Sequence, residues 1–335
     1  MTSSPTSSDL VTSPKDKENG GLTLAIVGCG IMGSSILTGI FDARSKGSST
    51  ECNIKKFIAT VHTMTSMERL RKQFHTRESR VHILVGDGGV LKAMQEADVV
   101  LLACKPYMIE GVLGMGGVRE ALGGKLIISV AAGTEVGKMT AALGIGEGGA
   151  NSKGKEKEGK DIRIVRAMPN LAASFRESNT VVEINPTMPL TQQHKSIIRY
   201  IFGCIGSIVE VGPQQFDAAS VLAGASMAFL TLAIDGILDG GVKEGIKREE
   251  GRDILVRSLK GLVGLLEGKG GDEKEGKNGK DGKGKGKGRT GDEIREQFSS
   301  PRGTTIEGLV GLEEDRVRYA YCRSIIKATK RSLEM

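Results

Sequence analysis

The sequence has no tryptophan, and aromatic residues make up only 4% of its 335 residues. Its five cysteines lie far apart and form no C-x-x-C pair. That spacing argues against a structural zinc site and against a disulfide framework. No Ser-His-Asp or Cys-His arrangement is evident either. The sequence thus gives no sign of a metal site or of an activated nucleophile.

Targeting signals are also missing. Residues 1–20 lack the apolar segment of a signal peptide and the early arginines of a mitochondrial presequence. The longest uncharged apolar-rich run, residues 221–234, is shorter than the roughly 20 residues that span a bilayer. We therefore expect a soluble cytoplasmic protein with no membrane partner. Residues 1–20 are expected to form a disordered N-terminal tail.

The formal net charge of +7 comes mostly from two Gly/Lys-rich tracts, residues 146–160 and 268–290. Both contain almost nothing that a core would bury, so we interpret them as flexible insertions rather than as arms that bind nucleic acid. The rest of the chain is close to neutral. It therefore offers no basic face to a nucleic acid.

The most informative pattern is the apolar run of residues 22–27 followed by Gly28-Cys-Gly30-Ile-Met-Gly33. Residues 34–41 continue with the apolar spacing of a helix. A strand, a glycine turn and a helix together present free backbone N–H groups to the pyrophosphate of a dinucleotide. Taken alone, the turn is also compatible with another kind of α/β protein.

Short apolar runs and helical patterns alternate through the first half of the chain. Strands are predicted at residues 54–61, 81–85, 98–104, 125–130, 161–166 and 180–184. Helices are predicted at 65–74, capped by Thr65 or Ser66, at 90–97, after Pro106, and from a cap at Thr134 to about residue 143. This alternation predicts a doubly wound parallel sheet.

The pattern changes after residue 212. Residues 216–242 are apolar with few charges and predict one long helix buried nearly all round. Further helices are predicted at 247–266, 305–312 and 315–332. The predicted α/β architecture is a Rossmann domain over residues 21–212 and an all-helical domain over 213–335. The helical domain would bury its excess apolar surface in a partner subunit.

Six motifs occur in an order that resembles the pyrroline-5-carboxylate reductases. They are G28-C-G-I-M-G33, A103-C-K-P106, S129-V-A-A-G133, R166-A-M-P-N170, D239-G-G-V242 and S300-P-R-G-T-T305. The resemblance extends over residues 22–333 apart from the two Gly/Lys tracts. Each motif is weak alone, and the ordered set is specific.

The resemblance implies an NAD(P)H-dependent oxidoreductase of proline biosynthesis, a homodimer or larger homo-oligomer. It would reduce the C=N bond of 1-pyrroline-5-carboxylate to give L-proline. The nicotinamide would supply the hydride, so the protein needs only to position the two reactants. The cofactor residues that the resemblance implies are Val27, Gly28, Cys29, Gly30, Ile31, Met32, Gly33, Ser34, Ala103, Cys104, Lys105 and Pro106.

The substrate carboxylate is expected on the loop before Ala228 and near residues 300–305. Ser226, Thr231, Thr304 and Thr305 are the candidate positioning residues. The family's Gly-Ser-Gly-Pro-Ala loop reads G224-A-S-M-A228 here, and Arg302 stands where a glycine is usual. Two alternatives therefore stay open: a related imine or keto-acid reductase, and a catalytically weak NADP-binding sensor or assembly protein.

The end of the second predicted strand bears on the choice of cofactor. NAD-specific domains place an acidic residue there for the ribose 2′-hydroxyl. This chain has no acid between Ala59 and Glu68, whereas Thr63, Ser66 and Arg69 can meet a 2′-phosphate. The sequence therefore favours NADPH over NADH, with Thr63 as a cofactor residue.

Overall fold

The computed structural model describes residues 21–45, 54–145, 162–268 and 288–335. They divide into two compact units: one holds the described residues up to Gly224 together with Ala328–Met335, and the other is Ala225–Lys327. The predicted N-terminal tail, the first Gly/Lys tract and most of the second lie outside the described residues. Each unit is described by itself below.

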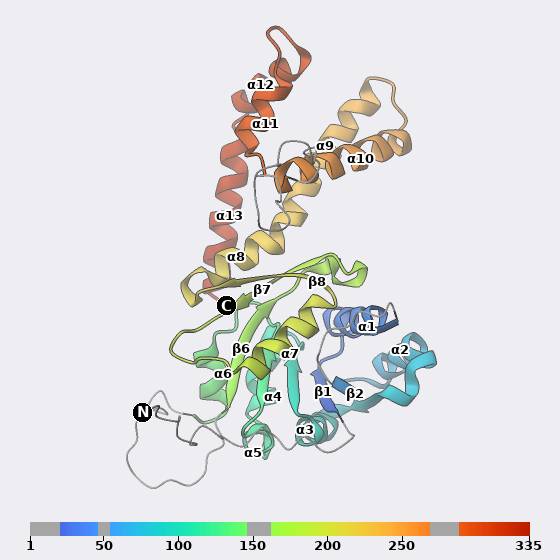
Figure 1. Cartoon of the computed structure of the whole chain (residues 1–335), viewed down its shortest axis with the longest axis vertical. Coiled ribbons are helices and arrows are strands. Elements are labelled where there is room, and N and C mark those ends of the chain that lie inside the picture. The colour runs from blue at the N-terminus through green and yellow to red at the C-terminus, as the bar shows by residue number, and fades with distance from the viewer. Residues whose placement is uncertain (1–20, 46–53, 146–161, 269–287) are drawn as a thin grey trace, which may run out of the picture. The chain divides into compact units, whose positions relative to one another are not determined.

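The first unit is built on an eight-stranded sheet with the order β3-β2-β1-β4-β5-β6-β7-β8 (Figure 1). All neighbours from β3 to β6 in this order are parallel, which confirms the predicted doubly wound sheet. The strands are β1 Leu22–Val27, β2 Ile54–Val61, β3 Val81–Val85, β4 Val99–Leu102, β5 Leu126–Ser129, β6 Arg163–Met168, β7 Ser178–Glu183 and β8 Gly206–Val211.

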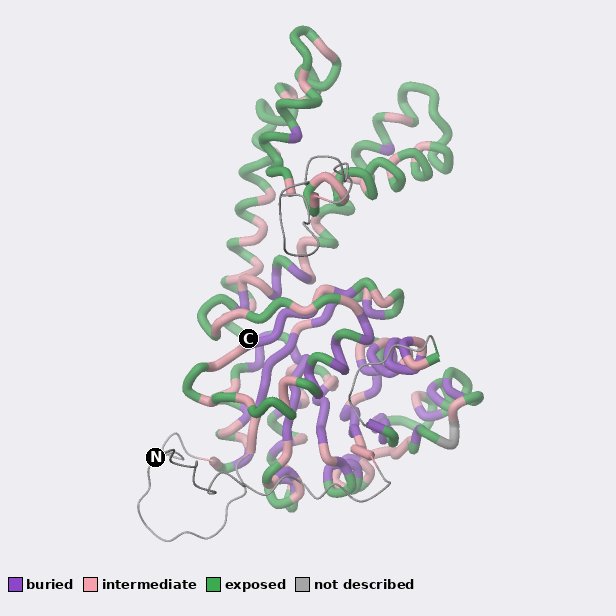
Figure 2. Tube along the Cα trace, in the orientation of Figure 1, coloured by how far each residue is buried: buried purple, intermediate pink, exposed green. Residues whose placement is uncertain are grey.

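Helices cover both faces of this sheet. They are α1 Ile31–Ser45, α2 Met64–Phe74, α3 Gly86–Glu96, α4 Ile109–Leu113, α5 Val118–Leu122, α6 Val136–Ala142, α7 Gln192–Gly203 and α8 Phe216–Ala223. Successive residues of β1 enter different cores: Leu24 and Ile26 pack on one face, Ala25 and Val27 on the other. This burial on both faces, shown along the strands in Figure 2, explains the unbroken apolar runs in the sequence.

The far edge of the sheet differs from the prediction. β7 is antiparallel to β6, and β8, which was not predicted, pairs in parallel with β7. The connection over residues 169–177 contains only the short 3₁₀ helix η3, Leu171–Phe175. A parallel crossover needs a dozen residues or more, so this short connection reverses the strand direction.

Two predicted helix caps are also wrong. The hydroxyl of Thr63, rather than Thr65 or Ser66, caps α2 by accepting from Ser66 N at 3.2 Å. α6 begins one residue after Glu135, which makes no side-chain cap, while Thr134 is buried. A buried side chain two residues before the first helical residue cannot reach the free N–H groups of the first turn.

The second unit is helical, with α9 Ala225–Lys243, α10 Arg248–Glu267, α11 Gly291–Phe298, α12 Thr304–Glu314 and the first part of α13 Val317–Leu333. The single long helix predicted over residues 216–242 is two helices, because α8 ends at Ala223 and α9 begins after Gly224. Glycine is a poor helix former, and at this position it ends α8. α11 was not predicted, and Thr290 and Glu293 start it with a capping box.

The prediction that this apolar segment is buried nearly all round is wrong for the chain alone. Within α9 only Leu238 is buried, packed against α10 with its Cδ2 atom 3.4 Å from where a Cβ on Gly251 would lie. Leu232 keeps 72% of its surface exposed. Figure 2 shows the same helices mostly exposed or intermediate. The second unit is thus rich in apolar residues, and many of their side chains are exposed in the single chain.

One stretch of the described residues, Pro213–Lys243, is long and apolar enough by composition to cross a membrane. This stretch includes Asp217, Asp235 and Asp239, so it extends beyond the uncharged run of residues 221–234. The break at Gly224 interrupts this stretch. Its exposed apolar side chains require a partner of some kind.

Candidate functional site

A cavity of about 590 Å³ lies at the carboxyl ends of the parallel strands of the first unit. The strand order reverses between β1 and β4, and open α/β sheets bind their ligands at such a switch point. The lining residues follow β1 through β6 in turn. They are Val27–Met32, Thr60–His62, Ser66, Arg69, Gly86, Asp87, Val90, Ala103–Pro106, Met108, Val112, Val130–Ala132 and Leu171.

The glycine turn fits a dinucleotide. Gly28 has a φ of +84°, and a Cβ there would lie 2.6 Å from Cys104 N, so only glycine fits. A Cβ on Gly30 would meet nothing within 4 Å and would occupy cavity space. α1 then begins at Ile31 with no acidic residue in its first turn. The free N–H groups of that turn suit a pyrophosphate.

The second strand holds this turn in place. Gly28 N donates to the buried hydroxyl of Thr60 at 3.2 Å, and Cys29 N donates to Thr60 O at 2.7 Å. On the other side of the turn, a Cβ on Gly33 would lie 3.0 Å from Ile26 Cγ2. The third glycine therefore serves the close packing of α1 on β1 and does not line the cavity.

Cationic and hydroxyl groups gather where β2 ends. Ser66 and Arg69 of α2 line the cavity beside His62. Arg69 Nη2 donates to Cys29 O at 2.9 Å, which ties α2 to the glycine turn. The acidic lining residue is Asp87, which follows β3 rather than β2. This end has donors for a phosphate and no carboxylate from the end of β2.

The opposite end of the cavity is mainly apolar. Pro106, Met108 and Val112 follow β4, residues 130–132 follow β5, and Leu171 follows β6. Such a surface suits a flat ring such as a nicotinamide. The lining therefore matches a dinucleotide along the whole cavity, from phosphate donors through the glycine turn to an apolar end.

Neither cysteine of the cavity is activated as a nucleophile. Burial raises the pKa of the Cys29 thiol to about 12 and that of Cys104 to about 11. Both thiols are protonated at neutral pH, and a thiol in that form is a weak nucleophile. The two residues act as small side chains that allow close packing around the turn.

The predicted cofactor residues line the cavity with three exceptions, Gly33, Ser34 and Thr63. Ser34 is buried in α1, and the Thr63 hydroxyl is used by the cap of α2. Among the lining residues outside that prediction, Thr60 and Val61 are the last residues of β2, and the others follow the end of a strand, as Asp87, Ala132 and Leu171 do. The rule that ligands gather at the carboxyl ends of parallel strands was the available signal.

The predicted substrate residues belong to the second unit. Ser226 lies in the first turn of α9, and Thr304 and Thr305 begin α12 after Gly303, which makes no side-chain cap. The Thr231 hydroxyl donates to Ala228 O at 2.7 Å, one turn earlier in the same helix. Arg302 has a φ of +60°, in the left-handed region.

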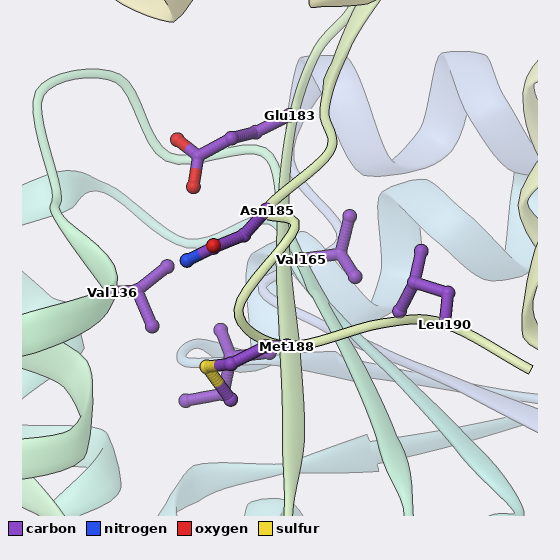
Figure 3. A pocket seen from close by; sticks show the side chains of 7 residues that line it. Val136, Val165, Glu183, Asn185, Met188 and Leu190 are labelled. Carbon is purple, nitrogen blue, oxygen red and sulfur yellow. The ribbon is translucent and has the colours of Figure 1, made fainter. Parts of the chain in front are cut away.

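A second cavity, of only about 10 Å³, has room for one water rather than a ligand. Figure 3 shows the Asn185 side chain pointing toward Val136 of α6, below Glu183. The carboxylate of Glu183 accepts from Arg166 Nη1 at 3.0 Å, and Asp217 accepts from Arg166 Nη2 at 3.0 Å. Burial raises the pKa of Glu183 although the guanidinium opposes this shift.

A doubly wound sheet with a glycine turn and a cavity across its switch point defines a dinucleotide-dependent oxidoreductase. Residues 23–133 match the family described as NADP oxidoreductase, coenzyme F420-dependent. Residues 213–335 match the pyrroline-5-carboxylate reductase dimerisation family. The two matched segments correspond to the cavity-bearing sheet and to a C-terminal helical region.

Full-length relatives give the more specific result. The chain is 35% identical to a pyrroline-5-carboxylate reductase of Lophium arboricola, over 93% of each sequence. It is 32% identical to a pyrroline-5-carboxylate reductase of Neurospora crassa, over 95% of this chain and 94% of that protein. The chain belongs to the pyrroline-5-carboxylate reductase family.

Solved structures agree on the fold. The Plasmodium falciparum pyrroline carboxylate reductase with NADP bound aligns with a TM-score of 0.70 at 21% identity, covering 93% of this chain and 97% of that one. The Streptococcus pyogenes enzyme aligns with a TM-score of 0.69 at 21% identity, covering 94% and 99%.

Proposed function

We propose that this chain reduces 1-pyrroline-5-carboxylate to L-proline with NADPH, the last step of proline biosynthesis. The observation that carries the proposal is the full-length identity to reductases of that name, up to 35% over 93% of the chain. The cavity supports it, because phosphate donors, glycine turn and apolar end follow one another along the ends of the strands.

In this mechanism the first unit binds and orients the cofactor. The free N–H groups of Ile31 and Met32 would hold the pyrophosphate, because Gly30 N already donates to Gly28 O at 2.8 Å, and Ser66 and Arg69 would hold the 2′-phosphate. NADPH, when bound, supplies the hydride to the carbon of the C=N bond. A protonated imine is already electrophilic, so the protein's contribution is positioning rather than acid catalysis.

The substrate carboxylate is assigned to the second unit. Ser226 offers a hydroxyl in the first turn of α9, and Thr304 and Thr305 offer two more where α12 begins. The free N–H groups of a helix's first turn attract a carboxylate. The Thr231 hydroxyl already bonds Ala228 O, and its direct role is the weakest of the four.

Assembly completes the proposal. Apolar side chains of α9, among them Leu230, Leu232 and Ile237, are more than half exposed in the single chain. The matched dimerisation family spans the whole apolar stretch, including Pro213–Lys243. We infer that a second copy, rather than a bilayer, covers this surface, and that the protein is a cytoplasmic homodimer or larger homo-oligomer.

The direct test is the loss of NADPH absorbance with 1-pyrroline-5-carboxylate. A related imine or keto-acid reductase is the second candidate, because Ala225, Met227 and Arg302 alter the substrate motifs. Other cyclic imines and 2-oxo acids should be assayed in parallel. Turnover of the pyrroline supports the proposal, and turnover of another substrate alone favours the second candidate. NADPH binding without any turnover indicates a sensor or assembly protein.

A further inference from the structure

The end of α13 belongs to the first unit, although the helix starts in the second. Residues Ala328–Met335 pack with the Rossmann sheet by internal contacts. They lie more than a hundred residues after the last strand, β8 Gly206–Val211. We call Ala328–Met335 the returning segment. Its contacts show which part of the sheet it touches.

One contact is with the loop that follows β5. Gly133 in this loop is buried and has a φ of +67°. A Cβ on Gly133 would overlap Met335 Cβ and would lie 3.2 Å from Ser332 O. The returning segment therefore lies directly against the backbone of this loop, at a distance that only a glycine permits.

A second contact joins the segment to α8 and, through Asp217, to Arg166 of β6. Ser332 Oγ donates to Asp217 Oδ1 at 2.9 Å, and the same oxygen accepts from Arg166 Nη2 at 3.0 Å. Arg166 pairs with Ser129 in the β5–β6 register. Ser129 is the last residue of β5, and the loop begins at the next residue, Val130. This second contact and the loop are thus neighbours across two strands.

The loop itself lines the large cavity. Val130, Ala131 and Ala132 contribute to its apolar end, and none of the three has a side chain that can form a hydrogen bond. Thr134 makes only a distant hydrogen bond, 3.5 Å from its hydroxyl to Ala132 O. Val130 N donates to Leu102 O at 2.9 Å, and Val130 and Ala131 are buried, so the sheet holds the first half of the loop. The second half, Ala132 and Gly133, depends on the returning segment, which packs against Gly133.

We propose that the returning segment positions the loop of residues 130–133 for the nicotinamide half of the cofactor, through Met335 at Gly133 and Ser332 at Asp217. The inference rests on the proposed binding of NADPH in this cavity. It makes Ser332 and Met335 positioning residues, because neither is among the cavity's lining residues. The adenosine end, which follows β2 and β3, lies on other strands and should not sense the change.

The test compares two ligands on wild type, a variant ending at Arg331, Ser332→Ala, Ser332→Thr and a control, Lys330→Ala. Calorimetry measures the Kd of NADPH and of adenosine 2′,5′-bisphosphate, which carries the 2′-phosphate end without the nicotinamide. For the shortened variant the Kd of NADPH should rise about tenfold, and less for Ser332→Ala, since a hydrogen bond to a charged group is lost. The bisphosphate Kd should not change. Ser332→Thr keeps a hydroxyl at this position, so its Kd for NADPH should equal that of wild type.

Lys330→Ala is the matched control, because the Lys330 side chain is exposed and its ion pair is with Glu334, at 4.0 Å. This variant should bind both ligands with the Kd values of wild type. Melting and sedimentation of each variant check that fold and assembly are retained. An unchanged NADPH Kd in the shortened variant overturns the inference, and so does an equal loss for both ligands. A wild type that binds the bisphosphate but not NADPH overturns it as well. A wild type that binds neither ligand overturns the proposed function itself.

Discussion

The two units treat their apolar residues in opposite ways. In the first unit Leu24, Ile26 and Phe57 are at most 1% exposed, between a sheet and helices from the same chain. In the second unit Leu232 is 72% exposed and Ile237 is 60% exposed. Apolar residues therefore have two roles here. In the first unit they form a core within the chain, and in the second unit they form a surface that another copy of the chain covers.

The difference shows what hydropathy can and cannot predict. Burying apolar surface stabilises by about 25 cal/mol per Å², whichever chain provides the cover. An apolar pattern thus predicts burial but not the partner that supplies it. Monomeric proteins rarely expose large contiguous apolar patches, so the second unit is incomplete as a single chain.

The largest effect is expected from a charge on the exposed face of α9. Leu232→Arg should produce monomers or aggregates without reductase activity, because an unpaired charge buried in a subunit contact costs several kcal/mol. Lys243→Glu, a charge change at an exposed position of the same helix, should remain assembled and active. Analytical ultracentrifugation with a parallel assay measures both. An active Leu232→Arg monomer would show that the second unit is complete by itself.

A change in the first unit should affect binding and leave assembly alone. Gly30→Val fills cavity space at the glycine turn, so NADPH binding should fall below detection while the melting temperature changes little. Gly137→Val is the control, since a Cβ there also meets nothing within 4 Å but lies in α6, outside the cavity. Fluorescence titration with NADPH measures the loss. Wild-type affinity in Gly30→Val would mean that the pyrophosphate lies elsewhere.

Local patterns predicted most of the first unit. The parallel strands are continuous apolar runs because both faces are buried, and such runs are visible in one sequence. The glycine turn was visible for a similar reason: a φ of +84° at Gly28 and its contact with Cys104 leave no other residue type possible there. Features that backbone geometry imposes at one position are readable at that position.

Features that depend on distant residues could not be predicted. The direction of β7 depends on the short connection through η3, and β8 is a partly exposed strand without a continuous apolar run. The cap at Thr63 rather than Thr65 depends on where α2 starts after β2. Arg166, Glu183 and Asp217 form a buried charged cluster. Arg166 contacts Asp217 only after β6 and α8 pack together. No spacing in the sequence indicates that pairing.

A smaller effect is expected at this buried cluster. Arg166→Gln leaves the carboxylates of Glu183 and Asp217 buried without their cation, which should lower the free energy of unfolding by about 3–5 kcal/mol. Glu183→Gln instead leaves one buried cation with one carboxylate, and its cost should stay below about 1 kcal/mol at pH 7. Urea unfolding measures both. Equal losses in the two variants would show that the net charge of the cluster does not matter.

The pKa of Glu183 sharpens this test. Burial raises that pKa in the folded state, so folding favours the protonated carboxyl. The stability that this preference contributes is complete below the unfolded pKa and is lost as pH rises through the folded value. Because glutamine does not ionise, Glu183→Gln should gain stability relative to wild type as pH rises from about 4 to 7. A difference that is constant with pH would contradict the shift.

The last prediction concerns the choice of cofactor within the first unit. Arg69 lines the cavity at the end of β2, whereas Arg71 lies on the same helix, exposed and outside the cavity. A guanidinium hydrogen-bonded to a 2′-phosphate is worth about 1.5–3 kcal/mol, so Arg69→Gln should reduce kcat/KM for NADPH about 10- to 100-fold. NADH has no 2′-phosphate, so only the smaller effect of losing the bond from Arg69 to Cys29 O should reach it. The ratio of the two values isolates the phosphate contact, and Arg71→Gln should leave that ratio at the wild-type value. A parallel loss for both cofactors would assign Arg69 to the glycine turn alone, and the preference for NADPH would then have to come from Ser66 or His62.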